Sequence, residues 1–400
     1  MLAARPTSIG TRHPELTRRE VRQFALLRPR VEPGVRTGVP QLPYFLTRRR
    51  CPSLVEPRDS LVRVSFLERP NPIIAAPMAG ATTPALAAAV SNAGGLGFLA
   101  AGYLSVDSMA DEVTAYRALT DATVAINLFT PQTDRSLELG PRLDDYQTEV
   151  ALTAAKYGVS PGDPSFDDDT FDGKVDWLVE NPVDVVSFTF GPVPPAAVFR
   201  LQEVGTTVGF TVTSEHEALQ AVGLGADFLV AQGCEAGGHR GTWHVSDQPN
   251  TLSAREVVAA IAGIGLPVIA AGGVGSAADV HALLDAGASA AAVGTLFLAC
   301  DESKAPAAHK AALTSGSFTS AAVTRAFSGR YARALVNDFV RAHDGRAPSA
   351  YPNVHHLTRP IRTAAAAAGD PQGMALWAGS GHAAPGRLTA PEVVARLAMM

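Results

Sequence analysis

Eight short apolar runs recur along the middle of the chain, each followed by a segment with helical spacing of its apolar residues. Polar and apolar residues hardly alternate within the runs, which is typical of strands buried on both faces of a parallel sheet. Eight such strand–helix units predict an α/β fold, a closed TIM (β/α)8 barrel. A doubly wound open sheet is the alternative. The runs lie at 73–76, 96–99, 123–128, 184–188, 207–212, 228–232, 267–271 and 290–293.

The intervening helices carry start and stop signals. Thr83 before Pro84 is a typical N-cap, and Gly94-Gly95 follows the end of that helix. Ser214 with Glu217 three positions later has the pattern of a capping box. These signals support a regular repeat of strand and helix. Helices are expected at 84–91, 106–119, 146–157, 195–204, 214–223, 254–263 and 277–286.

The repeat stops after Gly294, and the remainder predicts a C-terminal helical cap over one end of the barrel. The expected domain organisation is a basic, disordered N-terminal extension over 1–64, a barrel over 65–300, and a cap or lid over 301–400. Helices of the cap are expected at 305–313, 320–325, 332–342, 361–367 and 391–398.

Composition and charge narrow the class of protein. The chain is 46% hydrophobic and only 18% charged, which excludes a disordered or nucleic-acid-coating chain. Residues 1–70 hold 14 Arg and no Lys against 6 acidic residues, so a basic leader precedes an acidic body. A solvated tail is the interpretation of 1–64, with an anionic-surface contact, a transit peptide or a translation artefact as alternatives.

Cysteine usage and hydropathy predict a cytoplasmic protein that binds neither membrane nor nucleic acid. The three cysteines show no CxxC spacing, and no signal-peptide apolar region is present, which favours a reduced, intracellular chain. The uncharged stretch 257–278 is long enough for a membrane span but is interrupted by five glycines and a proline. A homodimer is left open.

The loop after the sixth strand contains the strongest candidate for chemistry. Four glycines between 233 and 241 surround His239 and Arg240. Glycines let backbone turn tightly beside a ligand, and an imidazole titrates near neutral pH. In a β/α barrel, chemistry lies at the carboxyl ends of the strands. His239 is therefore predicted to be a catalytic residue. A metal site with His244 is disfavoured because no second ligand cluster at zinc spacing accompanies it.

Other strand ends predict a ligand with a phosphate and a flat ring. Gly272-Gly273 and Gly294-Thr295 follow the last two strands, where free backbone N–H groups favour an anion. Tight strand-to-helix turns are the alternative. Asn127 and Gln232 are amides suited to the edge of a ring, or to local backbone. Pro77-Met78 presents an apolar wall. No nucleophile elbow, P-loop or Rossmann glycine motif is present.

Together these pieces resemble the nitronate monooxygenase family over about residues 65–380. Glu-Ala-Gly-Gly-His is also found in FMN-dependent enoyl reductases, but the following Arg-Gly and the pieces 328–330 and 376–379 favour the monooxygenases. The matching motifs are Ala76-Pro77-Met78-Ala79-Gly80, the segment 91–97, Asn127-Leu128-Phe129, the segments 186–191 and 211–214, the loop 232–241, and Ala271-Gly272-Gly273.

The resemblance implies a TIM barrel that binds FMN and oxidises alkyl nitronates, such as propionate-3-nitronate, with O2 to carbonyl compounds and nitrite. It implies His239 as the catalytic residue, with Arg240 and Tyr351 as candidates on the substrate side. The family's Gln-Gly-Thr-Arg is Val-Gly-Thr-Leu here, and Ser380 replaces a common Gln, so substrate-side details stay open. The residues implied to hold FMN are Ala76, Pro77, Met78, Asn127, Gln232, Gly237, Gly272, Gly273, Gly294 and Thr295.

Two other functions are weighed against this one. The first is an NADH-dependent FMN reductase of enoyl thioesters or quinones. The second, from another class, is a flavin-binding protein without turnover. Reduction by NADH would favour the first, and flavin binding without nitronate oxidation would favour the second.

Overall fold

Eight parallel strands close into a barrel in the computed structural model, which describes residues 65–381 and 386–399. The strand order is β1-β2-β3-β4-β5-β6-β8-β9, and β1 pairs with β9 to close the ring. The predicted TIM barrel is thus confirmed, while the extension predicted over 1–64 lies outside the described residues. The strands are β1 (Ile73–Ala75), β2 (Leu96–Ala100), β3 (Ala125–Phe129), β4 (Val185–Thr189), β5 (Thr207–Val212), β6 (Phe228–Gln232), β8 (Val268–Ala271) and β9 (Ala290–Val293).

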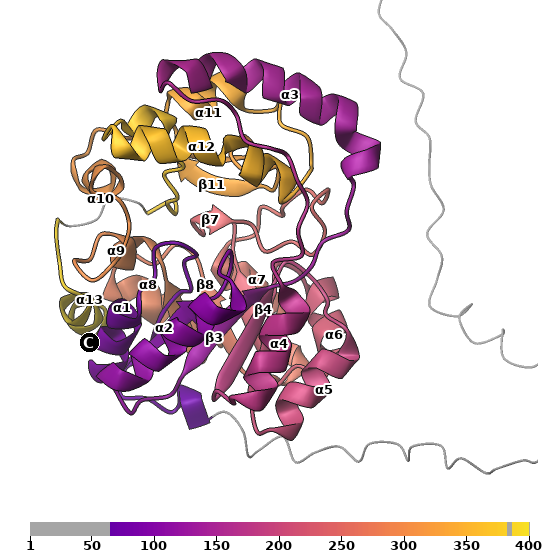
Figure 1. Ribbon diagram of the computed structural model, residues 1–400. Coiled ribbons are helices and arrows are strands. Elements are labelled where there is room, and N and C mark those ends of the chain that lie inside the picture. Colours follow the sequence, from indigo (N-terminus) through magenta and orange to yellow (C-terminus); the bar gives the residue numbers. More distant parts are fainter. Residues whose placement is uncertain (1–64, 382–385, 400) are drawn as a thin grey trace, which may run out of the picture. The chain divides into compact units, whose positions relative to one another are not determined.

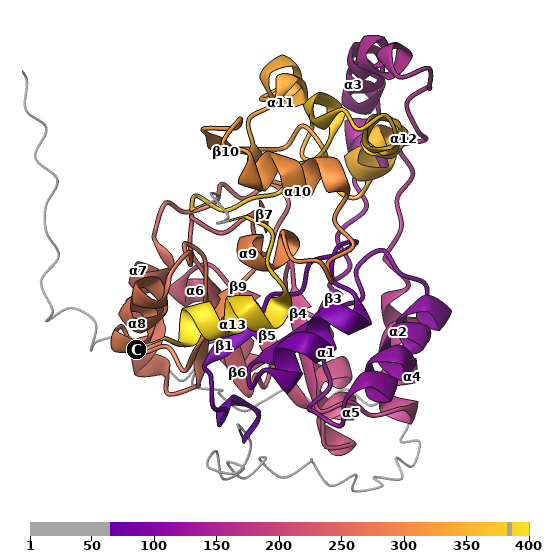
Figure 2. The ribbon, with the colours of Figure 1, turned by 90° about the vertical axis from the view of Figure 1, so that its left-hand side faces the viewer.

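Helices that follow the strands surround the barrel (Figures 1 and 2). Thr83, Ser214, Ser253 and Ser276 cap four of them through their side chains. Buried aliphatic side chains of strands and helices form the main core between the two layers. The helices are α1 (Pro84–Asn92), α2 (Val106–Leu119), α4 (Phe171–Glu180), α5 (Pro195–Glu203), α6 (Glu215–Gly223), α7 (Ala254–Ile261, continued by η3, Ala262–Ile264) and α8 (Ala277–Asp285).

The interior of the barrel is filled at its amino-terminal end. Side chains of Ile74, Phe98, Phe228 and Ile269 belong to one buried cluster. Phe66, from the short helix η2 (Ser65–Leu67), joins this cluster, with its ring 5.1 Å from that of Phe228. Because this end is packed, space for a ligand is left at the carboxyl ends of the strands.

A cap covers the carboxyl-terminal end of the barrel, as predicted (Figure 1). It has its own core, in which Leu143 and Val150 of α3 pack with Phe327, Val354 and Leu357. Its elements are α3 (Ser136–Lys156), β7 (Gly238–His239), α10 (Ala307–Thr314), β10 (Ala321–Thr324), β11 (Ala332–Leu335), α11 (Asp338–His343), α12 (Asn353–Ala367) and η4 (Pro371–Gly373). The short helix α9 (Thr295–Leu298) follows β9, and its Leu296, Phe297 and Leu298 belong to the core of the barrel.

The cap draws on more of the chain than its last hundred residues. The helix α3 enters from the segment after β3, and its length is greater than the predicted 146–157. The last helix, α13 (Ala390–Ala398), packs instead against α1, α8 and β1 of the barrel. We therefore propose a modified division, in which α3 and β7 belong to the cap although they precede residue 300, and α13 belongs to the barrel.

Two helices predicted for the cap are wrong. Residues 320–325 contain β10, and the predicted helix 332–342 begins as β11 before α11. These strands form an antiparallel sheet with β7 in the order β10-β11-β7. The alanine residues of these segments favour a helix locally. Here the backbone forms strands instead, because β11 pairs with β7, which contains His239. The helix α12 starts before the predicted 361–367, and α4 was not predicted.

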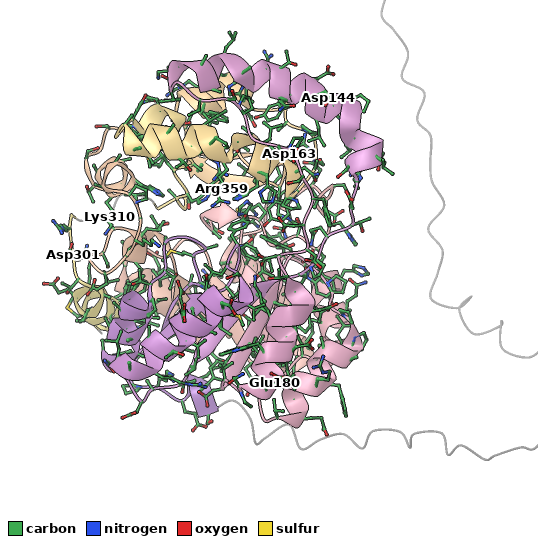
Figure 3. All side chains as sticks on the ribbon, viewed as in Figure 1. Asp144, Asp163, Glu180, Asp301, Lys310 and Arg359 are labelled. Carbon is green, nitrogen blue, oxygen red and sulfur yellow. The ribbon has the colours of Figure 1, made fainter. Side chains whose placement is uncertain are left out.

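Most charged side chains of the barrel and of the cap lie on the outside, although a few, such as Arg240, are buried. Asp144 on α3 and Glu180 at the end of α4 point away from the core (Figure 3). Within the described residues, every helix is too short or too polar to cross a lipid bilayer.

Candidate active site

A cavity of about 330 Å³ lies between the carboxyl ends of the barrel strands and the cap. Strand ends and their loops form most of its wall, and the cap contributes 305–306, His309 and residues between 375 and 381. The structure brings His239 together with all ten residues predicted to hold a cofactor. The predicted residues that line the cavity are Ala76, Pro77, Met78, Asn127, Gln232, Gly237, His239, Gly272, Gly273, Gly294 and Thr295.

The two glycine turns provide a backbone surface in this cavity. Gly272 and Gly273 have φ of 128° and 76°, values that favour glycine. Their N–H groups have no hydrogen-bond partner among the described residues. Asp279 already occupies the start of α8, because its carboxylate accepts hydrogen bonds from Gly275 N and Ser276 N. An anion would therefore bind to the N–H groups of the glycine turns, and not to the N-terminus of α8.

Thr295 links this surface to the cap. Its hydroxyl oxygen accepts a hydrogen bond from Gly379 N at 2.9 Å, which leaves its proton available to a ligand. Gly237 serves close packing, since a Cβ there would lie 2.5 Å from the carbonyl carbon of Ala378. The cap segment around 378–379 thus closes against both the His239 loop and the second glycine turn.

The two amides have different surroundings. Asn127 Oδ1 accepts hydrogen bonds from Ser187 Oγ at 2.8 Å and Thr189 Oγ1 at 2.9 Å, so Nδ2 is the donor left for the cavity. Gln232 uses both ends of its side chain on the loop of His239: Nε2 donates to His239 O, and Oε1 accepts from Gly241 N. Gln232 therefore positions the loop of His239.

His239 stands where the barrel meets the cap. It lies on β7 opposite Ala332 of β11. Its ring lies between three aromatic rings, with centroids 5.7 Å from Phe190, 5.8 Å from Tyr351 and 5.2 Å from Trp377. This surrounding fixes the imidazole at the cavity wall.

The hydrogen bonds of Ser328 determine which nitrogen of His239 carries the proton. Ser328 Oγ donates to Arg330 O at 3.2 Å and lies 2.9 Å from His239 Nε2. The serine oxygen then accepts the Nε2 proton, and Nδ1 is the acceptor nitrogen. Burial, together with the positive charges of Arg330 and Arg362, lowers the pKa of His239 to about 3. The imidazole is therefore neutral near neutral pH.

Arg240 and Tyr351 do not line the cavity. The Arg240 side chain is fully buried and donates a hydrogen bond from Nη1 to Gly233 O, behind the loop. Tyr351 is buried, contacts the ring of His239, and donates its hydroxyl proton to Tyr103. Glu235, on the same loop, is held elsewhere, because its Oε2 accepts a hydrogen bond from Ala254 N at the start of α7.

Several lining residues escaped the sequence analysis. Tyr103 follows β2 and lines the cavity, with its ring stacked 4.1 Å from that of His355. In a β/α barrel the active-site residues follow the carboxyl ends of the strands, and this rule, applied to β2, would have identified Tyr103. Phe190 follows β4 with an unusual φ of 88°. Trp377 and His309 come from the cap, for which no sequence rule gives a position. In the described residues no group of three or more His, Cys, Asp or Glu could hold a metal ion.

Three buried histidines predict that acid destabilises the fold. Burial lowers the pKa of His239 to about 3, of His309 to about 4, and of His355 well below 6.5. In the unfolded chain each imidazole takes up a proton below about pH 6.5, so stability falls as the pH falls through this window. Burial raises the pKa of Asp169 to about 6, so near pH 5.5 the folded chain binds a proton there that the unfolded chain does not. This proton offsets the uptake of one proton by a histidine of the unfolded chain. We expect a net loss of roughly 3 kcal/mol per pH unit near pH 5.5.

Urea unfolding between pH 5 and pH 7 measures this slope. The variant His309→Gln removes one of the three histidines, so its free energy of unfolding should depend less steeply on pH, by about 1.4 kcal/mol per unit. An unchanged slope in His309→Gln would contradict the assignment of a neutral buried imidazole at this position.

Comparison with known proteins identifies the family of this chain. A family model described as nitronate monooxygenase matches residues 63–399. A nitronate monooxygenase of Pseudomonas aeruginosa is 38% identical over 342 residues, which cover 82% of this chain and 95% of the relative. The crystal structure of a nitroalkane oxidase from Streptomyces ansochromogenes aligns with a TM-score of 0.80 and 46% identity, over 84% of this chain and 96% of that one. FabK from Thermotoga maritima is less similar, with a TM-score of 0.65 and 26% identity over 84% and 93%. The chain therefore belongs to the nitronate monooxygenase family.

Proposed function

We propose that this protein is an FMN-dependent monooxygenase that oxidises alkyl nitronates, such as propionate-3-nitronate, with O2 to carbonyl compounds and nitrite. One observation carries the proposal: a single cavity joins the two glycine turns to the neutral imidazole of His239. By their names, the relative from Pseudomonas aeruginosa acts on nitronates and that from Streptomyces ansochromogenes acts on nitroalkanes, and the shared family extends this substrate class to the chain.

The residues of the cavity fit FMN. Amide groups of Gly272 and Gly273 without partners, and the Thr295 hydroxyl, are suited to the phosphate. Asn127 Nδ2 is a donor for the edge of the ring, and Met78 is an apolar wall. A side chain at Gly294 would enter the cavity beside Met78 Sδ. Bound FMN would supply electron transfer between the nitronate and O2.

We assign His239 the role of proton acceptor for neutral nitroalkanes. Its Nδ1 lone pair is available, because the Nε2 proton is directed to Ser328. The imidazole would take the proton from the carbon next to the nitro group and leave a nitronate in the cavity. The aromatic rings around it keep water away from the transfer, and Gln232 holds its backbone in place. A role in binding the anionic nitro oxygens would instead need a second ring proton.

Nitrite release tests the proposed function. Purified protein supplied with propionate-3-nitronate and O2, without NADH, is expected to consume oxygen and release nitrite. Rapid loss of flavin absorbance on addition of NADH, with no nitrite from nitronate, would support the reductase of enoyl thioesters or quinones. Stoichiometric FMN with neither activity would support a non-catalytic flavin-binding protein.

The cellular location and the partners of the enzyme also belong to the proposal. Cys234 and Cys300 are free thiols in the described part of the chain, in keeping with a reduced, cytoplasmic location. We propose small-molecule partners only, namely nitronate or nitroalkane and O2. The formation of a homodimer by this protein remains a prediction.

A further inference from the structure

A row of hydroxyl groups lines the barrel side of the cavity, and the proposed chemistry leaves it without a role. Ser187 and Thr189 lie two positions apart on β4, so both side chains face the inside of the barrel. Asn127 of β3 and Thr211 of β5 lie on the two strands next to β4 and also line the cavity. Polar groups in apolar surroundings are costly unless they are hydrogen-bonded. The apolar residues around the row are Ile74, Phe98, Val230 and Ile269.

The hydrogen bonds of this row all run in one direction. Asn127 Oδ1 accepts the proton of Ser187 Oγ at 2.8 Å and that of Thr189 Oγ1 at 2.9 Å. Because Thr189 has a single hydroxyl proton, Thr211 Oγ1, which lies 2.9 Å away, donates to Thr189. Ser187 Oγ has no other acceptor among the described residues, so this orientation of the Asn127 amide is the one that satisfies the row. The chain of donors therefore runs from Thr211 through Thr189 to Asn127.

The protein holds the row in place without a ligand. Asn127, Ser187 and Thr211 are buried. The loop after β6 supports the far end of the row, because Trp243 Nε1 donates to Thr211 O at 3.0 Å. A Cβ at Gly241 would lie 2.7 Å from Thr211 Cγ2, so this loop also packs closely on the threonine side chain. The direction of the hydrogen bonds is thus fixed before any cofactor binds.

This direction strengthens one donor, the Nδ2 group of Asn127. Hydrogen bonds in a chain polarise one another, most of all in surroundings of low polarity. The hydroxyl protons draw electron density toward Asn127 Oδ1, which makes the N–H bonds of the same amide stronger donors. Nδ2 is the group that we assign to the edge of the flavin ring, so the whole row acts at that edge.

We propose that Ser187, Thr189 and Thr211 are positioning residues that form a hydroxyl relay, which acts through Asn127 and makes bound FMN easier to reduce. This inference rests on the proposed function. Reduction by two electrons and one proton adds one negative charge to the ring. A hydrogen bond to a charged acceptor is roughly twice as strong as one to a neutral acceptor. The hydroxyl relay therefore favours binding of the reduced cofactor over the oxidised one, which raises the midpoint potential of the flavin.

A redox titration of the holoenzyme against a reference dye tests the hydroxyl relay without turnover. Thr189→Val removes the hydroxyl group and keeps the shape of the side chain. We expect this variant to bind reduced FMN, relative to oxidised FMN, roughly three- to tenfold more weakly than the wild type, which corresponds to a midpoint potential about 14 to 30 mV lower. Thr189→Ser, which restores the hydroxyl, should stay within about twofold of the wild type.

Thr206→Val is the matched control. Thr206 is also buried, and its hydroxyl donates to Val183 O at 2.8 Å, just before β5 at the amino-terminal end of the barrel and away from the cavity. The control should lose stability, as any protein that loses a buried hydrogen bond does, and keep the wild-type midpoint potential. A wild-type potential in Thr189→Val, or an equal drop in Thr206→Val, would overturn the hydroxyl relay.

Thr211→Val provides a second test if Thr189→Val does not fold. It interrupts the same chain one position further from Asn127, so a smaller drop in the midpoint potential is expected, and an unchanged potential would overturn the hydroxyl relay. The proposed function is tested separately, by nitrite release. An unchanged potential in these variants of an enzyme that releases nitrite would contradict the hydroxyl relay alone. A lowered potential in a protein that releases no nitrite from propionate-3-nitronate would contradict the proposed function alone.

Discussion

The variant His239→Asn is expected to turn over a neutral nitroalkane roughly 10²–10⁴-fold more slowly than the wild type, the usual effect of losing an acid–base group. We propose the neutral Nδ1 as the proton acceptor in the cavity, and asparagine offers no comparable base. Asparagine can still bond to Ser328, so the sheet of β7 and β11 should persist. Steady-state nitrite release from nitroethane measures the effect.

A preformed nitronate provides the control for this variant. It needs no deprotonation, so His239→Asn should oxidise it within about tenfold of the wild-type rate. Equal losses on nitroalkane and nitronate would assign His239 to anion binding instead. Unchanged rates on both substrates would remove this residue from the mechanism.

The second large effect is expected at Gly294. The conformation at Gly294 suits any residue, and a Cβ there would lie 3.7 Å from Met78 Sδ, an ordinary contact. A larger side chain would occupy the cavity that we assign to FMN. Gly294→Val should therefore fold normally and bind FMN roughly 10- to 100-fold more weakly, as one to three kcal/mol of steric conflict predicts.

Two measurements are needed to interpret Gly294→Val. Flavin content after gel filtration reports FMN binding, and the melting temperature of protein stripped of flavin reports the fold. Gly223→Ala, where a Cβ meets nothing within 4 Å and the residue lies at the end of α6 away from the cavity, serves as the control. Wild-type flavin content in Gly294→Val would place FMN elsewhere, and a collapsed fold would show that Gly294 is required for packing.

The barrel could be predicted from the sequence because its signals are local. All eight strands are short, mainly apolar runs without regular alternation, and the predicted strands overlap those of the structure. The cap depends on contacts between distant segments. Ala332 and Ala334 favour helix locally, yet their backbone pairs with β7 and β10. At the start of α4, Thr170 has a left-handed φ of 50° and its side chain makes no cap hydrogen bond, so this helix begins without the side-chain cap that Thr83 gives to α1.

The same distinction applies to the site. Residues at strand ends, such as Asn127 and Gly272, could be placed at one rim because parallel strands end together. Sequence could not show that the Arg240 side chain turns behind its loop, since neighbours on a loop point in different directions. It also could not place Arg330 next to Phe190, because 140 positions of chain separate them and only the cap brings them together.

Anaerobic mixing of the purified protein with propionate-3-nitronate, followed by its absorbance spectrum, tests whether a bound flavin takes electrons from a nitronate. We expect a yellow protein with one FMN per chain, whose flavin absorbance changes on addition of the nitronate and recovers when O2 is admitted, with release of nitrite. A protein that takes up no flavin, or a bound flavin whose spectrum the nitronate leaves unchanged, would contradict this expectation.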